Sequence, residues 1–138
     1  MDTCGCPPTR TSGGVHHVIV NVNDLARARE FYGWLLPRFG YPGVNHWEAG
    51  SGWYGDRGSF WIKHAAGRDV FSKDRVGLCE IAFRAESRAE VDALAEELRV
   101  RGARILDPPR EYDYTPGYYA VFFTDPDGIK LELVHIPG

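Results

Sequence analysis

The 138-residue sequence has little of the features that mark several specialised classes of protein. Its 3 cysteines are too few to suggest a disulfide framework. No apolar run approaches the roughly 20 residues that a membrane-spanning helix needs, and residues 1–14 lack the apolar core of a signal peptide. A net charge of −3 predicts no basic surface for nucleic acid or an anionic membrane. We therefore expect a cytoplasmic protein whose partners include neither nucleic acid nor a membrane.

The composition is that of an ordinary globular domain. Hydrophobic residues make up 43% of the chain and charged residues 25%, and a chain of this length can bury a sizeable core in one domain. Residues 1–13 are rich in Gly, Pro, Ser and Thr, which predicts a flexible N-terminal tail before a single domain at residues 14–136. The tail contains Cys4 and Cys6, a C-x-C pair whose role the sequence leaves open.

A strand and a helix open this domain. Residues 14–24, GVHHVIVNVND, alternate between apolar and polar positions as a half-buried strand does. Asp24 is a candidate N-cap for the following segment, LARAREFYGWLL, in which apolar residues recur at helical spacing. Shorter strand-like segments continue as far as residue 65, and glycines between them indicate turns.

The same order of elements is then repeated. The segment LCEIAFRAES is a strand that leads into a capping box, Ser87-x-x-Glu90, and a second helical pattern. Further strands follow as far as residue 134, the last two joined by a DPDG turn. His17 aligns with Glu80, and Asp24 with Ser87, at one constant offset of 63 residues.

This internal repeat predicts the fold. We expect an α+β protein built from two β-α-β-β-β modules, at about residues 14–67 and 75–136. Each module would form a curved mixed sheet with a helix on one face, and the two free faces would curl around a shared cavity.

Strand alternation predicts which side chains face that cavity. If the aliphatic residues of each first strand cover a helix, His17 and Glu80 point to the opposite, concave face. In the last strand, Leu131 and Leu133 cover the helix, so Glu132 also points into the concavity. One imidazole and two carboxylates would then converge from three strands.

Such a donor set suits a divalent metal, with Mn²⁺, Fe²⁺, Mg²⁺, Zn²⁺ and Ni²⁺ all left open. The ion would polarise a bidentate oxygen substrate and stabilise an enediolate. In that scheme His17 and Glu132 hold the metal, and Glu80 is either a third ligand or the catalytic base. The alternative is that Glu80 forms an ion pair across the cavity with Lys63 or Arg84.

The sequence resembles a known family. The duplicated module, the opening HHVIVNVNDLARAREFYGWLL and the closing YYAVFFTDPDGIKLELVH are similar to segments of the vicinal oxygen chelate superfamily, which includes glyoxalases, bleomycin resistance proteins and extradiol dioxygenases. The resemblance covers about residues 14–136. It implies metal-ligand roles for His17 and Glu132, whereas the histidine usual at the third ligand position is replaced by Glu80.

The resemblance and the alternation also indicate candidates for a substrate pocket. The fourth ligand position of glyoxalase I falls on Lys63, with His64 adjacent, and which of the two faces the cavity is left open. Arg84 lies on the concave face by parity and could hold an anionic substrate. Tyr119 belongs to a group of aromatic residues that could line an apolar pocket.

Several functions agree with these observations. The leading hypothesis is a metal-dependent, glyoxalase-like enzyme that carries out lyase or isomerase-type proton transfer, or addition, on an oxygen-rich small molecule. The alternatives are a metal-free protein that binds a small molecule or an antibiotic, and an extradiol-type dioxygenase. Because members of the superfamily commonly pair and open sheet edges need cover, we also predict a homodimer.

Overall fold

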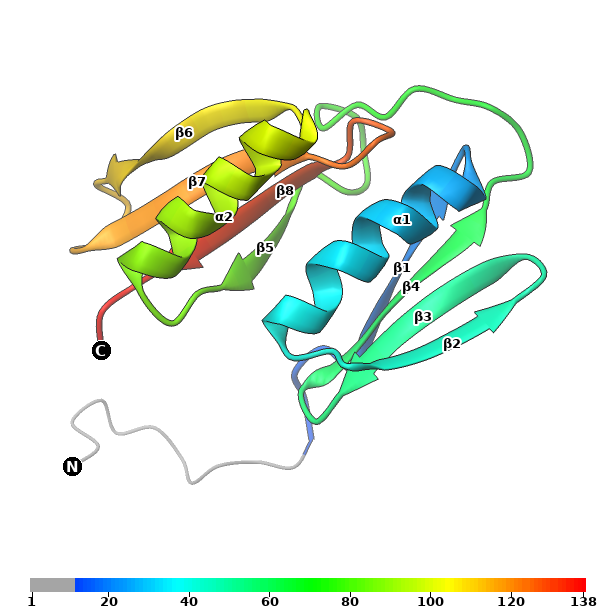
Figure 1. Ribbon diagram of the computed structural model, residues 1–138, viewed down its shortest axis with the longest axis horizontal. Coiled ribbons are helices and arrows are strands. Elements are labelled where there is room, and N and C mark those ends of the chain that lie inside the picture. The colour runs from blue at the N-terminus through cyan, green and yellow to red at the C-terminus, as the bar shows by residue number, and fades with distance from the viewer. Residues whose placement is uncertain (1–11) are drawn as a thin grey trace.

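The computed structural model describes residues 12–138, and the predicted tail, with Cys4 and Cys6, falls almost entirely outside them. Two modules with the same order of elements lie side by side (Figure 1). The first contains β1 (His17–Val22), α1 (Leu25–Leu35), the 3-10 helix η1 (Leu36–Phe39), β2 (Gly43–Trp47), β3 (Gly50–Gly55) and β4 (Gly58–His64). The second contains β5 (Ile81–Arg84), α2 (Arg88–Arg101), β6 (Ile105–Tyr112), β7 (Tyr118–Thr124) and β8 (Lys130–His135).

Each module forms one mixed sheet of four strands, and the two sheets have the same topology. The strand orders are β1-β4-β3-β2 and β5-β8-β7-β6. In each sheet the first strand is parallel to the last, and the remaining pairs are antiparallel. The predicted fold class, α+β with two β-α-β-β-β modules, is therefore confirmed.

The two helices begin where the repeat predicted. The Asp24 carboxylate accepts a hydrogen bond from the Arg27 backbone N–H at 3.1 Å. The Ser87 hydroxyl accepts one from the Glu90 backbone N–H, also at 3.1 Å. Each cap satisfies a backbone donor that has no partner within the helix. The offset of 63 residues in the sequence thus corresponds to a structural repeat.

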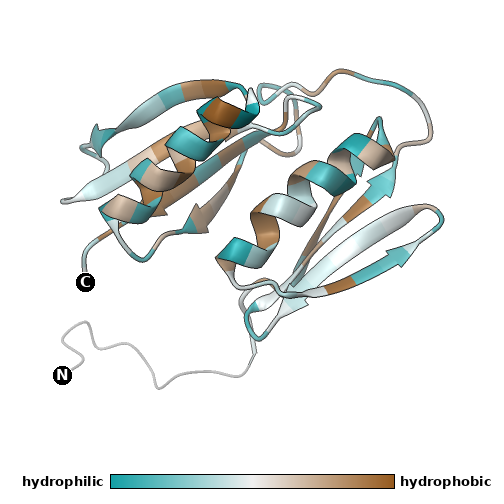
Figure 2. Ribbon diagram, in the orientation of Figure 1, coloured by the Kyte–Doolittle hydropathy of each residue, from teal (hydrophilic) through white to brown (hydrophobic). Residues whose placement is uncertain are grey.

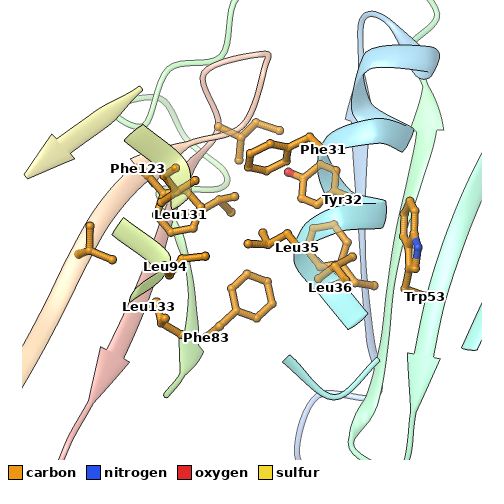
Figure 3. Packing of buried hydrophobic residues seen from close by; sticks show 14 of the residues in the cluster. Phe31, Tyr32, Leu35, Leu36, Trp53, Phe83, Leu94, Phe123, Leu131 and Leu133 are labelled. Atoms are coloured by element: carbon orange, nitrogen blue, oxygen red, sulfur yellow. The ribbon is translucent and has the colours of Figure 1, made fainter. Parts of the chain in front are cut away.

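One continuous hydrophobic core joins the modules. Hydrophobic and hydrophilic residues alternate along both helices (Figure 2), as expected for helices with one buried face. Phe31 and Leu35 of α1 point toward Leu94 of α2 and toward Leu131 of β8 (Figure 3). The helix-covered sides of the two sheets therefore share the core, which leaves the opposite sheet faces for other contacts.

Hydrogen bonds from the DPDG turn also tie the modules together. Asp125, which is buried, accepts a hydrogen bond from the Tyr32 hydroxyl of α1 at 2.7 Å. Its other oxygen accepts from the backbone N–H groups of Asp127 and Ile129, both at 2.9 Å. The Asn23 backbone N–H donates to Asp127 at 3.0 Å. The turn thus has a structural role between the modules, besides joining β7 to β8.

Among residues 12–138 there is no helix with the length and apolar character needed to cross a membrane.

Candidate functional site

The open face of the second sheet carries a buried carboxyl group. Leu131 and Leu133 of β8 are fully buried in the core, so Glu132 between them points to the opposite face. Only 1% of Glu132 is exposed to solvent. The side chain of Glu132 is therefore shielded from solvent although it lies on the face opposite the helix. This glutamate therefore requires polar partners on its own face.

Tyr118 is one such partner. Its hydroxyl donates a hydrogen bond to Oε2 of Glu132. The register between β7 and β8 places Phe122 opposite Glu132. Tyr118 and Phe122 both belong to β7 and are separated by an even number of residues, so Tyr118 lies on the same face. Tyr112 packs against the rings of Tyr118 and Phe122 in edge-to-face contacts. The carboxyl group of Glu132 is thus surrounded by aromatic side chains with one phenol directed at it.

Glu80 and Lys130 complete the group of side chains. The Lys130 ammonium lies 3.1 Å from Oε1 of Glu80. The register pairs Ile81 with Leu131, which brings Glu80, just before β5, to the position beside Lys130 at the start of β8. Glu80 does form an ion pair, as one of the sequence hypotheses held, but its partner is Lys130 and neither Lys63 nor Arg84.

The surroundings of Glu132 raise the pKa of its carboxyl group to about 7. Burial is the largest cause, and the adjacent Glu80 raises the pKa further, whereas the hydrogen bond from Tyr118 and the charge of Lys130 oppose the rise. The pKa of the Tyr118 hydroxyl is also raised, first by burial and then by its contact with Glu132. Near neutral pH the carboxyl group of Glu132 is therefore divided between its protonated and ionised forms.

His17 does not join these carboxyl groups. It lies at the start of β1, is exposed, and places its Nδ1 atom 2.9 Å from Nδ1 of His16. Within residues 12–138 no group of three or more His, Cys, Asp or Glu side chains is arranged to hold a metal ion. The structure thus brings Glu80 and Glu132 together but does not add His17 to them.

The register of the first sheet decides between Lys63 and His64. Phe60 and Ile62 of β4 are buried on the helix side, so Lys63 points to the opposite face. Lys63 pairs with Asn21 and lies on the same face as His17. His64 points away from that face, with Nε2 located 3.1 Å from the Asn23 carbonyl oxygen.

Of the two remaining pocket candidates, one lies on the face of Glu132. Arg84 pairs with Val134 and is exposed on that face. Tyr119 is on the other side, because its hydroxyl donates to Asp92 of α2 at 2.5 Å and its ring lies under the Arg88 guanidinium. The placement of Tyr119 in the pocket was wrong. Alternation along β7 turns Tyr119 toward the helix and its neighbour Tyr118 toward the open face.

Sequence reasoning did not single out Lys130 as a site residue. Lys130 and Glu132 are two residues apart in one strand, so alternation alone puts them on the same face. Contact between Lys130 and Glu80 depends on the parallel pairing of β5 with β8. Tyr118 is the direct neighbour of Tyr119 in the sequence, and only the structure assigns it the hydrogen bond to Glu132.

The donors near Glu132 do not fit a divalent metal within one chain. Glu80 is bound by the Lys130 ammonium, and Glu132 accepts a hydrogen bond from Tyr118. The nitrogen donor expected from His17 is absent from this group. A hard divalent ion needs several oxygen or nitrogen ligands that are free of competing cations. We therefore assign no chemical step to a metal.

The open face of the first sheet carries aromatic rings that lie against glycines. A Cβ atom on Gly52 would be 1.9 Å from the Trp61 ring, and one on Gly43 would be 2.2 Å from the Tyr54 ring. The Trp61 indole N–H donates to the Ser59 hydroxyl at 2.7 Å, which fixes the orientation of the ring. Tyr54 remains 48% exposed and Ile19, on the same face, 51% exposed. This face therefore presents apolar surface to solvent.

The two modules share one order of strands, each has an open sheet face, and one of these faces carries the buried carboxyl group of Glu132. The profile of the Glyoxalase/Bleomycin resistance protein/Dioxygenase superfamily matches residues 14–133. The chain belongs to this superfamily.

Relatives of known sequence or structure agree with this assignment. The chain is 39% identical over 126 residues to the uncharacterised protein YqjT of Bacillus subtilis, covering 87% of this chain and 97% of YqjT. It is similar to the crystal structure of a candidate glyoxalase from Bacillus halodurans, with a TM-score of 0.79, 33% identity, and coverage of 90% of this chain and 96% of that one. A glyoxalase/bleomycin resistance protein from Albidiferax ferrireducens has a TM-score of 0.75 and 25% identity, with coverage of 89% and 98%.

Proposed function

We propose that this protein is an enzyme that transfers a proton within an oxygen-rich small molecule, in a lyase or isomerase-type reaction. The observation that carries the proposal is the buried carboxyl group of Glu132, which lies on an open sheet face beside Glu80 and Tyr118. Pairs of carboxyl groups whose surroundings differ are a common arrangement for acid–base catalysis. Here Glu80 is paired with a cation, and Glu132 is held by a phenol.

The chemistry follows from the partners of Glu132. The Glu132 carboxylate would take a proton from a carbon next to a substrate carbonyl, and the electrons of that C–H bond would move to the carbonyl oxygen as an enolate. The ammonium of Lys130 and the guanidinium of Arg84, on the same face, supply positive charge for this oxygen. In an isomerisation of a 2-hydroxycarbonyl compound, the proton of the neighbouring hydroxyl would pass to the enolate oxygen, and Glu132 would return its proton to the former carbonyl carbon while the neighbouring carbon becomes the new carbonyl. In a lyase reaction the enolate would re-form its carbonyl group, and a leaving group on the next carbon would depart with the electrons of its bond, leaving a C=C double bond.

The metal expected from the sequence is a separate proposal. Divalent ions are frequent in the superfamily, and two adjacent carboxyl groups supply oxygen donors. A metal at this place would require the Glu80–Lys130 ion pair to open and another nitrogen or oxygen donor to approach. Metal analysis of the purified protein tests this, with Glu132→Gln as the variant that should lose any ion held at this site.

A second function is a binding protein without turnover. The observation that favours it is the apolar face of the first sheet, where glycines allow the rings of Trp61 and Tyr54 to lie flat. Flat aromatic surfaces stack on planar ligands. The same face would also be covered if two chains associate as a homodimer, which stays a prediction. The cytoplasmic location likewise stays a prediction.

The test of the enzymatic function is proton exchange. A panel of 2-oxo acids, 2-hydroxyaldehydes and 2-hydroxyketones is incubated with the protein in D₂O, and loss of the signal of the C–H next to the carbonyl is followed by ¹H NMR. We expect Glu132→Gln to lower the exchange rate by about 10²–10⁴-fold. The exposed residue Glu48 provides the control, because Glu48→Gln should leave the rate unchanged.

The variant Tyr118→Phe tests whether proton exchange depends on the pKa of Glu132. Because the hydrogen bond from Tyr118 lowers the pKa of Glu132, its loss should move the rising limb of the pH–rate profile to higher pH. Equal exchange rates in the wild type and Glu132→Gln, at every pH, would contradict the proposed role. Binding of panel members without any exchange would favour the binding protein.

A further inference from the structure

Lys130 is the cation of the carboxyl site. Its ammonium lies 3.1 Å from Oε1 of Glu80 and 4.8 Å from the centre of the Phe122 ring, which itself lies opposite Glu132. Among the described residues, the other ion pairs involve neither Glu80 nor Glu132. The ion pair and the contact with the aromatic face both hold the ammonium on this side of the sheet.

The position of Lys130 is built into the fold rather than being a chance contact of a flexible side chain. The lysine side chain is only 22% exposed and that of Glu80 32% exposed. Lys130 pairs with Thr124 of β7, and its neighbour Leu131 pairs with Ile81 of β5. Two strand pairings therefore determine where the ammonium can be placed relative to Glu80.

Two carboxyl groups at one place need a positive charge or a shared proton. Repulsion between them raises the pKa of one group, and a nearby cation lowers it again. In this chain Glu80 raises the pKa of Glu132, and Lys130 opposes that rise. The carboxylate oxygens of such a pair are also the donors that hard divalent ions prefer. A lysine ammonium and a divalent ion would thus compete for the same oxygens.

We propose that Lys130 is a built-in counter-ion that occupies the cation position of the Glu80–Glu132 pair, and that removal of its ammonium turns the pair into a divalent-metal site. This inference deepens the proposed function and rests on the same carboxyl pair. It is tested by ion binding instead of turnover, so the failure of one is distinguishable from the failure of the other.

The test compares Mn²⁺ binding by the full-length wild type and Lys130→Met. Methionine has a similar length and no charge, so the side chain still fills its space above Phe122. Mn²⁺ is titrated by isothermal calorimetry and, in parallel, by loss of the free-ion electron paramagnetic resonance signal. We expect Lys130→Met to bind one Mn²⁺ per chain with an affinity about a hundredfold higher than the wild type at this place.

Two further variants assign the gain to this site. Lys130→Arg keeps the charge and should bind Mn²⁺ as weakly as the wild type. Lys130→Met combined with Glu132→Gln should lose the gained affinity while keeping any ion bound elsewhere, for instance at His16 and His17. Circular dichroism of each variant shows whether it is folded, and Lys130→Gln serves as a second neutral variant if Lys130→Met is not.

Two outcomes would overturn the proposal. If folded Lys130→Met and Lys130→Gln gain no Mn²⁺ affinity over the wild type, the carboxyl pair is not a cation site that Lys130 fills. If the wild type already binds Mn²⁺ stoichiometrically and Glu132→Gln abolishes this binding, a metal and Lys130 occupy the site together. Equal gains in Lys130→Met and Lys130→Arg would likewise show that the charge of Lys130 is not the cause.

Discussion

At the scale of single residues, the most unusual feature is a glutamate in the interior of a sheet. Glu132 lies between Leu131 and Leu133, which are fully buried, and is itself 1% exposed. A carboxylate without water is stable only when other groups replace its hydration. Tyr118 and Lys130 do so in part, but burial outweighs them, and the pKa of Glu132 rises. The ionised form of Glu132 therefore destabilises the folded protein, and groups with a shifted pKa of this kind are common at functional sites.

This cost predicts how stability depends on pH. The pKa of Glu132 rises from 4.5 to about 7 on folding, so its contribution to stability is fully present below pH 4.5 and is lost as pH rises through 7. Between pH 5.5 and 8.5 this loss is about 2 kcal/mol. The glutamine in Glu132→Gln does not titrate, so the difference in the free energy of unfolding between these two pH values should be smaller in this variant by about that amount.

Urea denaturation at the two pH values measures this difference, and Glu48→Gln is the control with an exposed glutamate. Asp125 also has a raised pKa, caused first by burial, but it titrates in the wild type and the variants alike. A pH dependence of Glu132→Gln identical to that of the wild type would show that the carboxyl group of Glu132 has no raised pKa.

At the scale of elements, the two sheets use their open faces differently. The face of the second sheet carries the carboxyl groups and tyrosines, whereas that of the first carries aromatic rings that lie on glycines. Gly52 has an ordinary backbone conformation, so what requires glycine there is the space taken by the Trp61 ring. The sequence predicted turns at the glycines of this region, but Gly50 and Gly52 lie within strand β3.

This packing predicts a coupling between two positions of neighbouring strands. Gly52→Ala puts a methyl group where the Trp61 ring lies and should destabilise the protein by about 1–3 kcal/mol. In a Trp61→Val background, which frees that space, the same substitution should cost much less. A double-mutant cycle based on urea denaturation measures the coupling energy. Equal costs of Gly52→Ala in both backgrounds would mean that another contact requires the glycine.

At the scale of the whole molecule, the modules are joined by their core and by the DPDG turn. Tyr32 and Asp125 are both buried, and their hydrogen bond of 2.7 Å links α1 to the turn between β7 and β8. Tyr32→Phe removes the donor and leaves an oxygen of Asp125 without its partner, which should cost about 1–3 kcal/mol of stability. Tyr54→Phe, at an exposed tyrosine, should cost almost nothing, and a thermal or urea melt of both variants checks this.

The exposed face of the first sheet predicts association of two chains. Ile19 is 51% exposed, Tyr54 48% and Trp47 40%, and side chains of this kind are usually covered when they gather on one face. We expect a homodimer in analytical ultracentrifugation at micromolar concentration, and Ile19→Arg should shift it toward the monomer. A wild type that sediments only as a monomer would contradict the prediction and leave this face free for a ligand.

The sequence by itself determined the two modules, the helix starts at Asp24 and Ser87, and the face on which Glu132 lies. These features depend on short-range periodicity and on capping, which neighbouring residues encode locally. For the same reason the sequence could decide that His17 lies on an open sheet face.

Only the tertiary structure decided which of these residues meet. Contact between Glu80 and Lys130 depends on the register of β5 with β8, and Tyr118 instead of Tyr119 reaches Glu132 because of how β7 pairs with β8. His17 belongs to the first sheet and Glu132 to the second, so their separation depends on how the two modules pack against each other. Such contacts join residues far apart in the chain and are set by the packing of whole elements, which no local pattern specifies.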